Sequence, residues 1–374
     1  MPIVLGWPSH VPAPQPMRII LQCALMVLTA SAASAQRRII LFIGDGVGVS
    51  HWTAARFAAD NLAVNRFKVV GLVDTRASNS KVTDSAAGAT AYSAGIRTFN
   101  GAIGVGPDSQ PVETVLEVAK ARGWGTGLVA TSSVTHATPA SFAAHVRSRA
   151  SEFDIAQQMT ALGPDVVLGG GTRWFTPATR PDRVDLLGQL RRTHTVVTDA
   201  FMFEGVNPAA TSRLVGLFGD NQMPAAPQRT PTLPAMTRKA IDILSRDPDG
   251  FFLMVEGSQP DWRSHDNDTI ESVVAEMLDF DAAIGVALEY QRRVPDVLIL
   301  VVADHETGGL AIELARDSTT RAERVVADYT TTGHTGQMIP LFASGPGAER
   351  FAGIIDNARV GQLLLEVARR RGRK

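Results

Sequence analysis

The chain is 374 residues long, 45% hydrophobic and nearly neutral, with a formal net charge of −1 at pH 7. A chain of this length can bury a large core, so it does not need the disulfide bonds of a small secreted scaffold. Basic and acidic residues are scattered without a long run of one sign, which argues against a nucleic-acid-binding or membrane-binding polybasic segment. Cys23 is the only cysteine.

The N-terminal segment has the pattern of a secretory signal peptide. Met17 and Arg18 precede the apolar stretch IILQCALMVLTASAASA, which contains Cys23 and ends in an Ala-x-Ala sequence at Ala35. A positive start, an apolar run too short to span a bilayer and small residues at the end are typical of a cleaved signal. We therefore predict a signal region at 1–35, translation from Met17, cleavage after Ala35, and a periplasmic or secreted mature chain without a membrane anchor. An uncleaved N-terminal anchor helix is the alternative.

Short, nearly continuous apolar runs alternate with amphipathic stretches through residues 36–374. Buried strands of a parallel sheet, which are covered on both faces, are predicted at 38–45, 126–131, 165–171, 251–257, 297–305 and 339–345. Helices are predicted at 111–123 and 269–293, and an irregular surface excursion at the Pro-, Gly- and Asn-rich residues 201–233. This alternation predicts a single α/β domain with a doubly wound, mostly parallel sheet sandwiched by helices.

Acidic residues and histidines follow several of the predicted strands, at the edge of the sheet where ligands bind. They are Asp45, Glu256, Asp261, His265, Asp304, His305 and, before the last strand, His334. Taken singly, each could be a turn residue, a solvated strand end or half of an ordinary i,i+4 pair. Taken together, they predict a metal site, because mixed imidazole and carboxylate ligation suits zinc and an all-oxygen set suits magnesium.

The stretch VTDSAAGATAYSAG, at 82–95, places an acid and a hydroxyl at the head of an Ala-rich helix. Thr83, Asp84 or Ser85 could simply cap this helix. The alternative is that Ser85 is a nucleophile at a helix N-terminus, where free amides favour an anion. No histidine adjoins Ser85 in the sequence, so a bound metal is the expected activator, and two metals about 4 Å apart would clamp the oxygens of a phosphoryl transfer.

Six segments, in this order, resemble the alkaline phosphatase family over nearly the whole chain from Arg38 onward. They are IILFIGDGVGVS, VTDSAAGATAYSAGIRTFNGAIGV, SSVTHATPASFAAHVRSR, MVEGSQPDWRSH, VVADHETGG and GHTG. The resemblance implies an alkaline-phosphatase-like fold and hydrolysis of small phosphate monoesters to inorganic phosphate, through a phosphoserine on Ser85. It also implies two zinc ions and one magnesium ion per chain, and a homodimer.

The resemblance further implies a role for each matching residue. One zinc would be held by Asp261, His265 and His334, the second by Asp304, His305 and Asp45, and the magnesium by Asp45, Thr138 and Glu256. Asp84 would organise the pocket beside Ser85. Arg149 would clamp phosphate, since a guanidinium fork matches two phosphate oxygens where a lysine could not.

Two residues and one segment depart from part of the family's pattern. His136 stands where some members have Asp, which bears on whether the third site prefers magnesium or zinc. Trp262 stands where members carry Lys or His, and its indole cannot supply a positive charge near phosphate. Only 28 residues, 306–333, separate VVADH from His334, so the accessory cap should be small.

Two other classes of function compete with a phosphomonoesterase. One is a phosphodiesterase or sulfatase of the same superfamily, and the other is a secreted metal- or phosphate-binding protein without activity. Arg149 and the Asp-Ser-Ala context of Ser85 favour a monoesterase, because a sulfatase would require a Pro two residues after the nucleophile, where this chain has Ala87.

Overall fold

The computed structural model describes residues 37–316 and 323–370. The predicted signal region at 1–35, with Met17, Cys23 and the cleavage position, lies outside the described residues. Within these ranges, no helix combines the length and the hydrophobicity that a membrane span requires.

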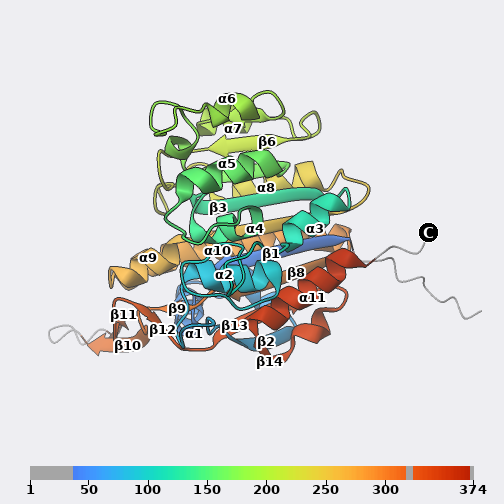
Figure 1. Ribbon diagram of the computed structural model, residues 1–374. Coiled ribbons are helices and arrows are strands. Elements are labelled where there is room, and N and C mark those ends of the chain that lie inside the picture. The colour runs from blue at the N-terminus through green and yellow to red at the C-terminus, as the bar shows by residue number, and fades with distance from the viewer. Residues whose placement is uncertain (1–36, 317–322, 371–374) are drawn as a thin grey trace, which may run out of the picture. The chain divides into compact units, whose positions relative to one another are not determined.

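A ten-stranded sheet forms the centre of the described chain, with helices on both faces (Figure 1). Its strands lie in the order β14 (Gly353–Asp356), β2 (Val69–Asp74), β13 (Ile339–Ser344), β8 (Val297–Ala303), β1 (Arg38–Gly44), β7 (Phe251–Gly257), β3 (Gly125–Ser133), β4 (Val166–Gly170), β6 (Leu214–Leu217) and β5 (Thr195–Val197). β13 is antiparallel to both of its neighbours, and the other neighbouring pairs are parallel. The prediction of a mostly parallel, doubly wound sheet is confirmed.

The middle of the sheet is its most deeply buried part. The residues of β1 from Ile39 to Ile43 have no exposed surface, and the apolar runs of β7 and β8 flank them on either side. Full burial of an aliphatic side chain contributes about 1.5–3 kcal/mol, so three such strands form a stable platform. Burial on both faces also explains why these runs show no alternation of polar and apolar residues.

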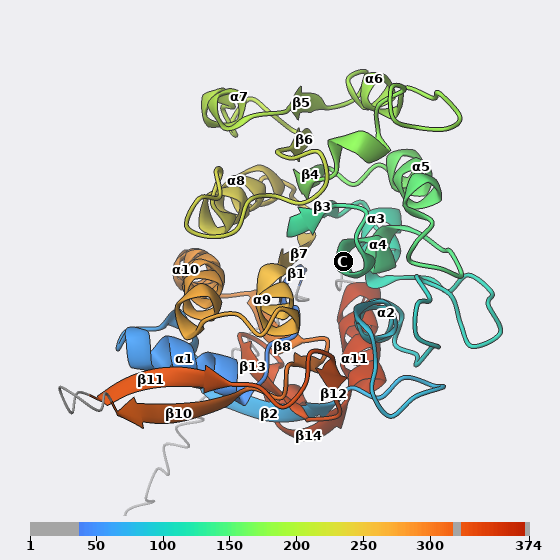
Figure 2. The same ribbon diagram turned by 90° about the vertical axis from the view of Figure 1, so that its left-hand side faces the viewer.

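The helices form two layers, one on each face of the sheet (Figure 2). One layer contains α1 (Val49–Ala58), α7 (Ala200–Gly205), α8 (Leu233–Leu244) and α10 (Ile270–Arg293). The other contains α2 (Ser85–Ala94), α3 (Val115–Ala121), α4 (Ala137–Ala143), α5 (Glu152–Leu162), α6 (Leu186–Leu190) and α11 (Asn357–Arg369). A further helix, α9 (Gln259–His265), follows β7. Short 3₁₀ turns, η1 (Ala63–Arg66), η2 (Thr172–Trp174) and η3 (Ala348–Phe351), connect other elements.

Both helices predicted from the sequence exist, but only one of them has the predicted bounds. α10 follows the N-cap Thr269 and ends at Arg293, as predicted for 269–293. The helix predicted at 111–123 is shorter, because Thr114 caps α3 in a reciprocal capping box with Glu117. Pro111, four residues before Val115, instead forms a β-bridge with Val105.

The prediction of an irregular excursion at 201–233 is wrong for part of that segment. α7 covers its start, and β6 inserts between β4 and β5 in the main sheet. The apolar run of β6 is only four residues long and lies among Gly, Pro and Asn, so it shows no periodicity from which a strand could be recognised. The predicted small insertion after VVADH corresponds to the antiparallel pair β10 (Ala311–Arg316) and β11 (Glu323–Asp328).

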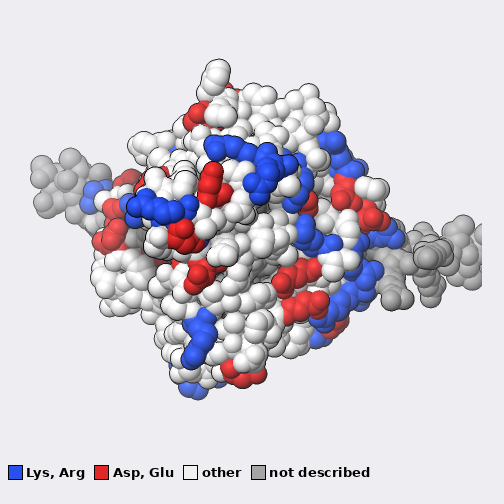
Figure 3. Space-filling model, turned by 45° about the horizontal axis from the view of Figure 1, so that its top comes forward, with Lys and Arg blue, Asp and Glu red and all other residues white. Residues whose placement is uncertain are grey.

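Charged side chains of both signs share the surface. On the face that Figure 3 presents, Lys and Arg lie interspersed with Asp and Glu. The protein also has exposed ion pairs, such as Arg359 with Glu366 at 3.0 Å and Arg369 with Glu113 at 2.8 Å. Such pairs contribute at most about 1 kcal/mol each, so the stability of the fold rests mainly on the buried core.

One ion-pair network, however, is buried and joins the segment before α8 to α10. Arg229 Nη2 lies 2.7 Å from Glu276 Oε2, and Arg229 Nη1 lies 2.6 Å from Asp279 Oδ2. The side chains of Arg229 and Glu276 are each only 2% exposed. Glu276 also accepts a hydrogen bond from the Ala226 amide at 2.8 Å. The network therefore ties a segment without regular structure to the longest helix.

Replacing Arg229 with methionine should lower the free energy of unfolding by about 3–5 kcal/mol, because two largely buried carboxylates lose their cation. Urea unfolding followed by circular dichroism measures this loss. The matched control is Arg292→Met, which removes a 73% exposed arginine from a pair with Glu289 on the same helix. That change should cost less than about 1 kcal/mol. Equal effects of the two substitutions would contradict the prediction.

Candidate active site

The carboxyl ends of three adjacent strands bring buried acids together. β8, β1 and β7 lie side by side, and Gly44 at the end of β1 pairs with Ala303 and Gly257. Asp45, Glu256 and Asp304 therefore meet at one edge of the sheet, and none of the three has exposed surface. The register of three buried strands thus fixes the positions of these acids.

Ser85 is the first residue of α2, and Asp84 precedes it as the N-cap. The Asp84 carboxylate accepts a hydrogen bond from the Ala87 amide at 3.0 Å, so Asp84 performs the capping role. The Ser85 hydroxyl lies 3.2 Å from His305 Nε2 and 3.5 Å from Asp45 Oδ1. The fold thus supplies the imidazole that the sequence around Ser85 lacks.

The small residues of α2 allow this helix to pack directly against the acids. Every residue of α2 is buried. A Cβ atom at Gly88 would lie 3.0 Å from the Asp304 carbonyl oxygen, which is closer than most side chains allow. The Ala- and Gly-rich composition is therefore a requirement of close packing beneath Ser85, as well as a helical preference.

The first group of candidate metal ligands joins α9 to the short strand β12 (His334–Thr335), which pairs with β9 (Glu306–Thr307). Asp261 Oδ1 lies 3.3 Å from His265 Nε2 and 3.7 Å from His334 Nε2, and the two Nε2 atoms are 3.1 Å apart. His334 Nδ1 donates to the Thr83 carbonyl oxygen at 2.9 Å, which leaves Nε2 free to bind a metal. Asp261 raises the pKa of His265 to about 9, so metal binding there must displace a proton.

The second group consists of Asp45, Asp304 and His305, which are completely buried. His305 Nε2 lies 3.4 Å from Asp45 Oδ1 and 3.3 Å from Asp304 Oδ2. The His305 ring also stacks on His334 with ring centroids 3.5 Å apart, so the first two groups adjoin each other. Both groups combine imidazole with carboxylate, as zinc sites do.

The third group contains Asp45, His136 and Glu256, and one ligand atom of each lies within 4.8 Å of the others. Thr138, two residues after His136, is also completely buried. In the described part of the chain, five buried atoms of these groups have no hydrogen-bond partner: Asp45 Oδ2, His136 Nδ1, Thr138 Oγ1, Glu256 Oε1 and Asp304 Oδ2. Each such atom costs about 1–3 kcal/mol, a cost that bound cations would relieve. The donor types therefore fit zinc and magnesium.

Burial changes the protonation of these groups. The pKa of Asp45 is raised well above its ordinary value, first by burial and then by the charge of Asp304. Burial also raises the pKa of Glu256 to about 7. The pKa of His136 falls to about 3, because burial and then Arg149 disfavour the imidazolium. His136 is therefore neutral, and a bound cation would restore the charged form of the acids.

Arg149 is held beside Ser85 by Asp84. Arg149 Nη1 donates to Asp84 Oδ2 at 3.1 Å, and the same oxygen accepts from the Gly101 amide at 3.0 Å. Arg149 Nη2 lies 3.0 Å from His136 Nε2. The guanidinium is thus fixed at two points while its side chain stays 30% exposed, so its remaining N–H groups can meet an incoming anion.

Three residues that sequence analysis did not single out support the candidate ligands. Thr307 Oγ1 donates to Asp261 Oδ1 at 2.5 Å, and Ser132 Oγ donates to Glu256 Oε2 at 3.2 Å. His51 Nε2 lies 2.9 Å from Ser264 Oγ and so connects α1 to α9, beside His265. Thr307 and Ser132 lie within recognisable motifs, VVADHETGG and SSVTHATPASFAAHVRSR, whereas His51 lies in none of the six.

Known proteins resemble this chain in both sequence and fold. A family model described as alkaline phosphatase matches residues 36–328. Alkaline phosphatase 3 of Bacillus subtilis is 35% identical over 413 residues, which cover 87% of this chain and 87% of that protein. The structure of alkaline phosphatase from the Antarctic bacterium TAB5 has a TM-score of 0.82 and 39% identity, and covers 88% of this chain and 98% of the other.

A variant of that Antarctic protein matches as well. In it a histidine is replaced by aspartate, and its structure is described as having Mg bound in a site called M3. Its TM-score is 0.82 with 37% identity, and the match covers 90% of this chain and 99% of that one.

Proposed function

This chain belongs to the alkaline phosphatase family and is a phosphomonoester hydrolase, and from that premise we propose that it acts through a phosphoserine formed on Ser85. The observation that carries the proposal is the convergence of groups on the Ser85 hydroxyl. The second and third candidate ligand groups reach within 3.5 Å of it, through Asp45 and His305. The N-terminus of α2 and the guanidinium of Arg149 add positive charge beside it.

The proposed metals are two zinc ions and one magnesium ion. Asp261, His265 and His334 would hold one zinc, and Asp45, Asp304 and His305 would hold the other. Asp45, Thr138 and Glu256 would hold the magnesium. The orphaned buried atoms of these groups support the assignment. When bound, such ions lower the pKa of a hydroxyl or water and neutralise charge on a departing oxygen.

The groups of the chain itself bind and orient the ester. Arg149 and the free amides at the start of α2 would hold non-bridging oxygens of the phosphate dianion. Ser85 Oγ attacks phosphorus and loses its proton, so that the Oγ–P bond forms while the ester P–O bond breaks, and the departing oxygen takes up one proton to leave as the alcohol. A water oxygen then attacks the same phosphorus and the Oγ–P bond breaks. One proton of that water returns to Ser85 Oγ, and inorganic phosphate leaves.

A comparison of three p-nitrophenyl esters tests the proposed function. We expect kcat/KM for the phosphate monoester to exceed that for the corresponding phosphodiester and sulfate by orders of magnitude, because Arg149 and the ligand groups suit a dianion. Faster hydrolysis of the diester or the sulfate would identify a phosphodiesterase or a sulfatase instead. Tight phosphate binding without turnover of any ester would identify a binding protein.

His136→Asp should raise the preference of the third site for magnesium over zinc by about tenfold or more, because a hard carboxylate replaces a neutral imidazole. The magnesium concentration that gives half-maximal activity, together with metal analysis of the protein, measures this preference. His136→Asn is the matched control, since it keeps the size of the aspartate but not its charge. An unchanged magnesium requirement in His136→Asp would show that His136 does not face the third ion.

We further propose that residues 36–374 form one catalytic domain that is exported after removal of 1–35 and assembles as a homodimer. The described residues, 37–316 and 323–370, fall in one compact unit, which supports the domain assignment. The signal-like pattern supports export, and the family supports the dimer. Mass spectrometry of the exported protein and sedimentation analysis would test these statements. A mature chain that begins before Gln36, or a monomer at micromolar concentration, would contradict them.

A further inference from the structure

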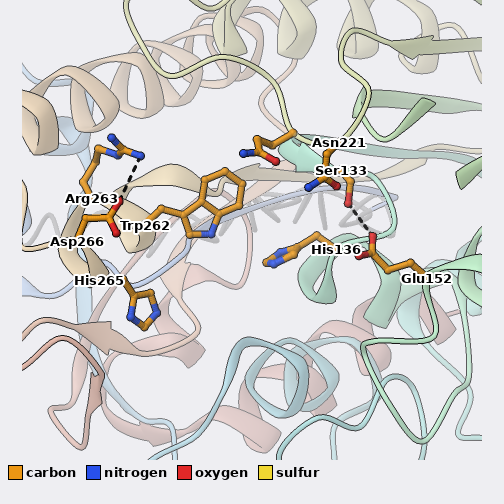
Figure 4. A pocket seen from close by; sticks show the side chains of 9 residues that line it. Ser133, His136, Glu152, Asn221, Trp262, Arg263, His265 and Asp266 are labelled. Atoms are coloured by element: carbon orange, nitrogen blue, oxygen red, sulfur yellow. Dashed lines mark hydrogen bonds and ion pairs between the residues drawn. The ribbon is translucent and has the colours of Figure 1, made fainter. Parts of the chain in front are cut away.

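A cavity of about 410 Å³ opens beside the proposed phosphate site (Figure 4). His136 and His265 line it, and these residues also contact Arg149 and His334 of the site. Its volume lies within the range of small-molecule sites, about 300–1,000 Å³. The cavity is therefore placed to receive the alcohol part of a phosphate ester.

One wall of the cavity carries a carboxylate that is oriented without being neutralised. Glu152 Oε2 accepts hydrogen bonds from Ser133 Oγ at 3.0 Å and from Thr135 Oγ1 at 2.6 Å. Ser133 is 4% exposed and Thr135 is completely buried, so both hydroxyls are fixed. Within the described ranges, Glu152 forms no ion pair, and its Oε1 remains free of hydrogen bonds.

The arginine in the opposite wall does not balance this charge. Arg263 Nη1 lies 3.0 Å from Asp268 Oδ2, and Arg263 Nη2 lies 4.0 Å from Asp266 Oδ2. Arg263 is thus already matched by two acids, of which Asp266 also lines the cavity. Among the acids of the lining in the described chain, Glu152 is therefore the one without an ion-pair partner, and its wall of the cavity favours a cationic ligand.

An aromatic ring and two amides complete the lining. The Trp262 indole stands between Arg263 and Asn221 in Figure 4. Its ring meets His136 edge-on, with centroids 5.9 Å apart and planes at 89°. Indole is the best aromatic surface for a cation, above all for an alkylated ammonium group. The exposed side chains of Asn221 and Gln222 add donors and acceptors for hydroxyl groups.

We propose that this cavity selects phosphate monoesters whose alcohol carries a cationic nitrogen, with Glu152 pairing with the cation and Trp262 covering it. The proposal rests on the proposed function of the adjoining site. The preferred substrates would be phosphate esters of amino or quaternary ammonium alcohols. Without this cavity, the choice of substrate would depend on the phosphate group alone.

Matched pairs of esters test the selection. Each pair consists of an ω-trimethylammonioalkyl phosphate and the neutral ester in which carbon replaces nitrogen, starting from phosphocholine and 3,3-dimethylbutyl phosphate and continuing with longer linkers. At the linker length that reaches Glu152, we expect the charged ester to have a kcat/KM about fivefold to twentyfold higher than its neutral partner. Glu152→Gln keeps the size of the side chain and should reduce this ratio to below about twofold.

The matched control is Glu349→Gln, which removes an exposed acid from η3 and should keep the wild-type ratio. Inhibition of the wild-type protein by the product alcohols gives a measure that needs no variant, since each cationic alcohol should inhibit at a lower concentration than its neutral partner. A ratio at or below one for every linker, or an unchanged ratio in Glu152→Gln, would overturn the proposal. Turnover of the neutral esters tests the proposed hydrolysis independently of the cavity. If no neutral ester were hydrolysed, the proposed phosphomonoesterase mechanism at Ser85 would be rejected.

Discussion

Ser85→Ala should lower kcat for p-nitrophenyl phosphate by a factor of at least about 10³, because no oxygen remains to form the covalent intermediate. The metal content should stay at the wild-type level, since Ser85 belongs to none of the three ligand groups. The fold should also be retained, because Asp84 rather than Ser85 caps α2. The loss of activity would therefore report the chemistry at one hydroxyl.

Ser93→Ala is the matched control for this experiment. Ser93 lies on the same helix, is completely buried and donates to the Ser141 carbonyl oxygen at 2.6 Å, far along α2 from the site. Its removal should leave kcat within about twofold of the wild type. The experiment uses an ester that is radiolabelled at phosphorus and stops turnover with acid. Label should then remain bound to the wild type and to Ser93→Ala, but not to Ser85→Ala. Label on Ser85→Ala would place the nucleophile elsewhere.

The elements that can be predicted from the sequence are the long helix and the fully buried strands. β1, β7 and β8 are continuous apolar runs, and α10 has a clear N-cap at Thr269, so each was recognised from local composition. β5, β6 and β14 were not, because strands of three or four residues show no pattern that separates them from loops. β2 was not either, because it is partly exposed and lacks the continuous burial of the central strands. The antiparallel direction of β13 depends on the course of the chain between strands, which composition does not encode.

The site shows the same division between local pattern and long-range contact. Asp45, Glu256 and Asp304 could be grouped from sequence, because the ends of neighbouring parallel strands meet at one edge. The 3.2 Å contact between Ser85 and His305 could not, since 220 residues separate them. The cavity around Trp262 was equally hidden: Glu152 and Asn221 come from separate segments, and neither carries a motif.

Removal of the metals by a chelator should abolish hydrolysis and leave a protein in which ionisation of Glu256 destabilises the fold as the pH rises. Burial raises the pKa of Glu256 from its ordinary 4.5 to about 7. Between these values the folded state keeps a proton that the unfolded state has lost, so deprotonation favours unfolding. The titration of Glu256 should therefore lower the free energy of unfolding of the metal-free protein by roughly 3 kcal/mol from about pH 4.5 to pH 7. Asp45, whose pKa is also raised, acts in the same direction as Glu256. The lowered pKa of His136 acts in the opposite direction, so the contribution of Glu256 is the difference between the wild type and a variant without it.

Urea unfolding at several pH values distinguishes this effect from a general loss of stability. Glu256→Gln lacks the titrating group, so the free energy of unfolding of its metal-free form should lack the decrease that Glu256 contributes to the metal-free wild type. Addition of zinc and magnesium to the wild type should restore activity and remove most of the decrease that Glu256 contributes, because cations bind the charged carboxylates of the folded state only. Full activity after chelation would reject a metal-dependent reaction. An equal pH dependence in wild type and Glu256→Gln would show that Glu256 is not the buried acid that titrates.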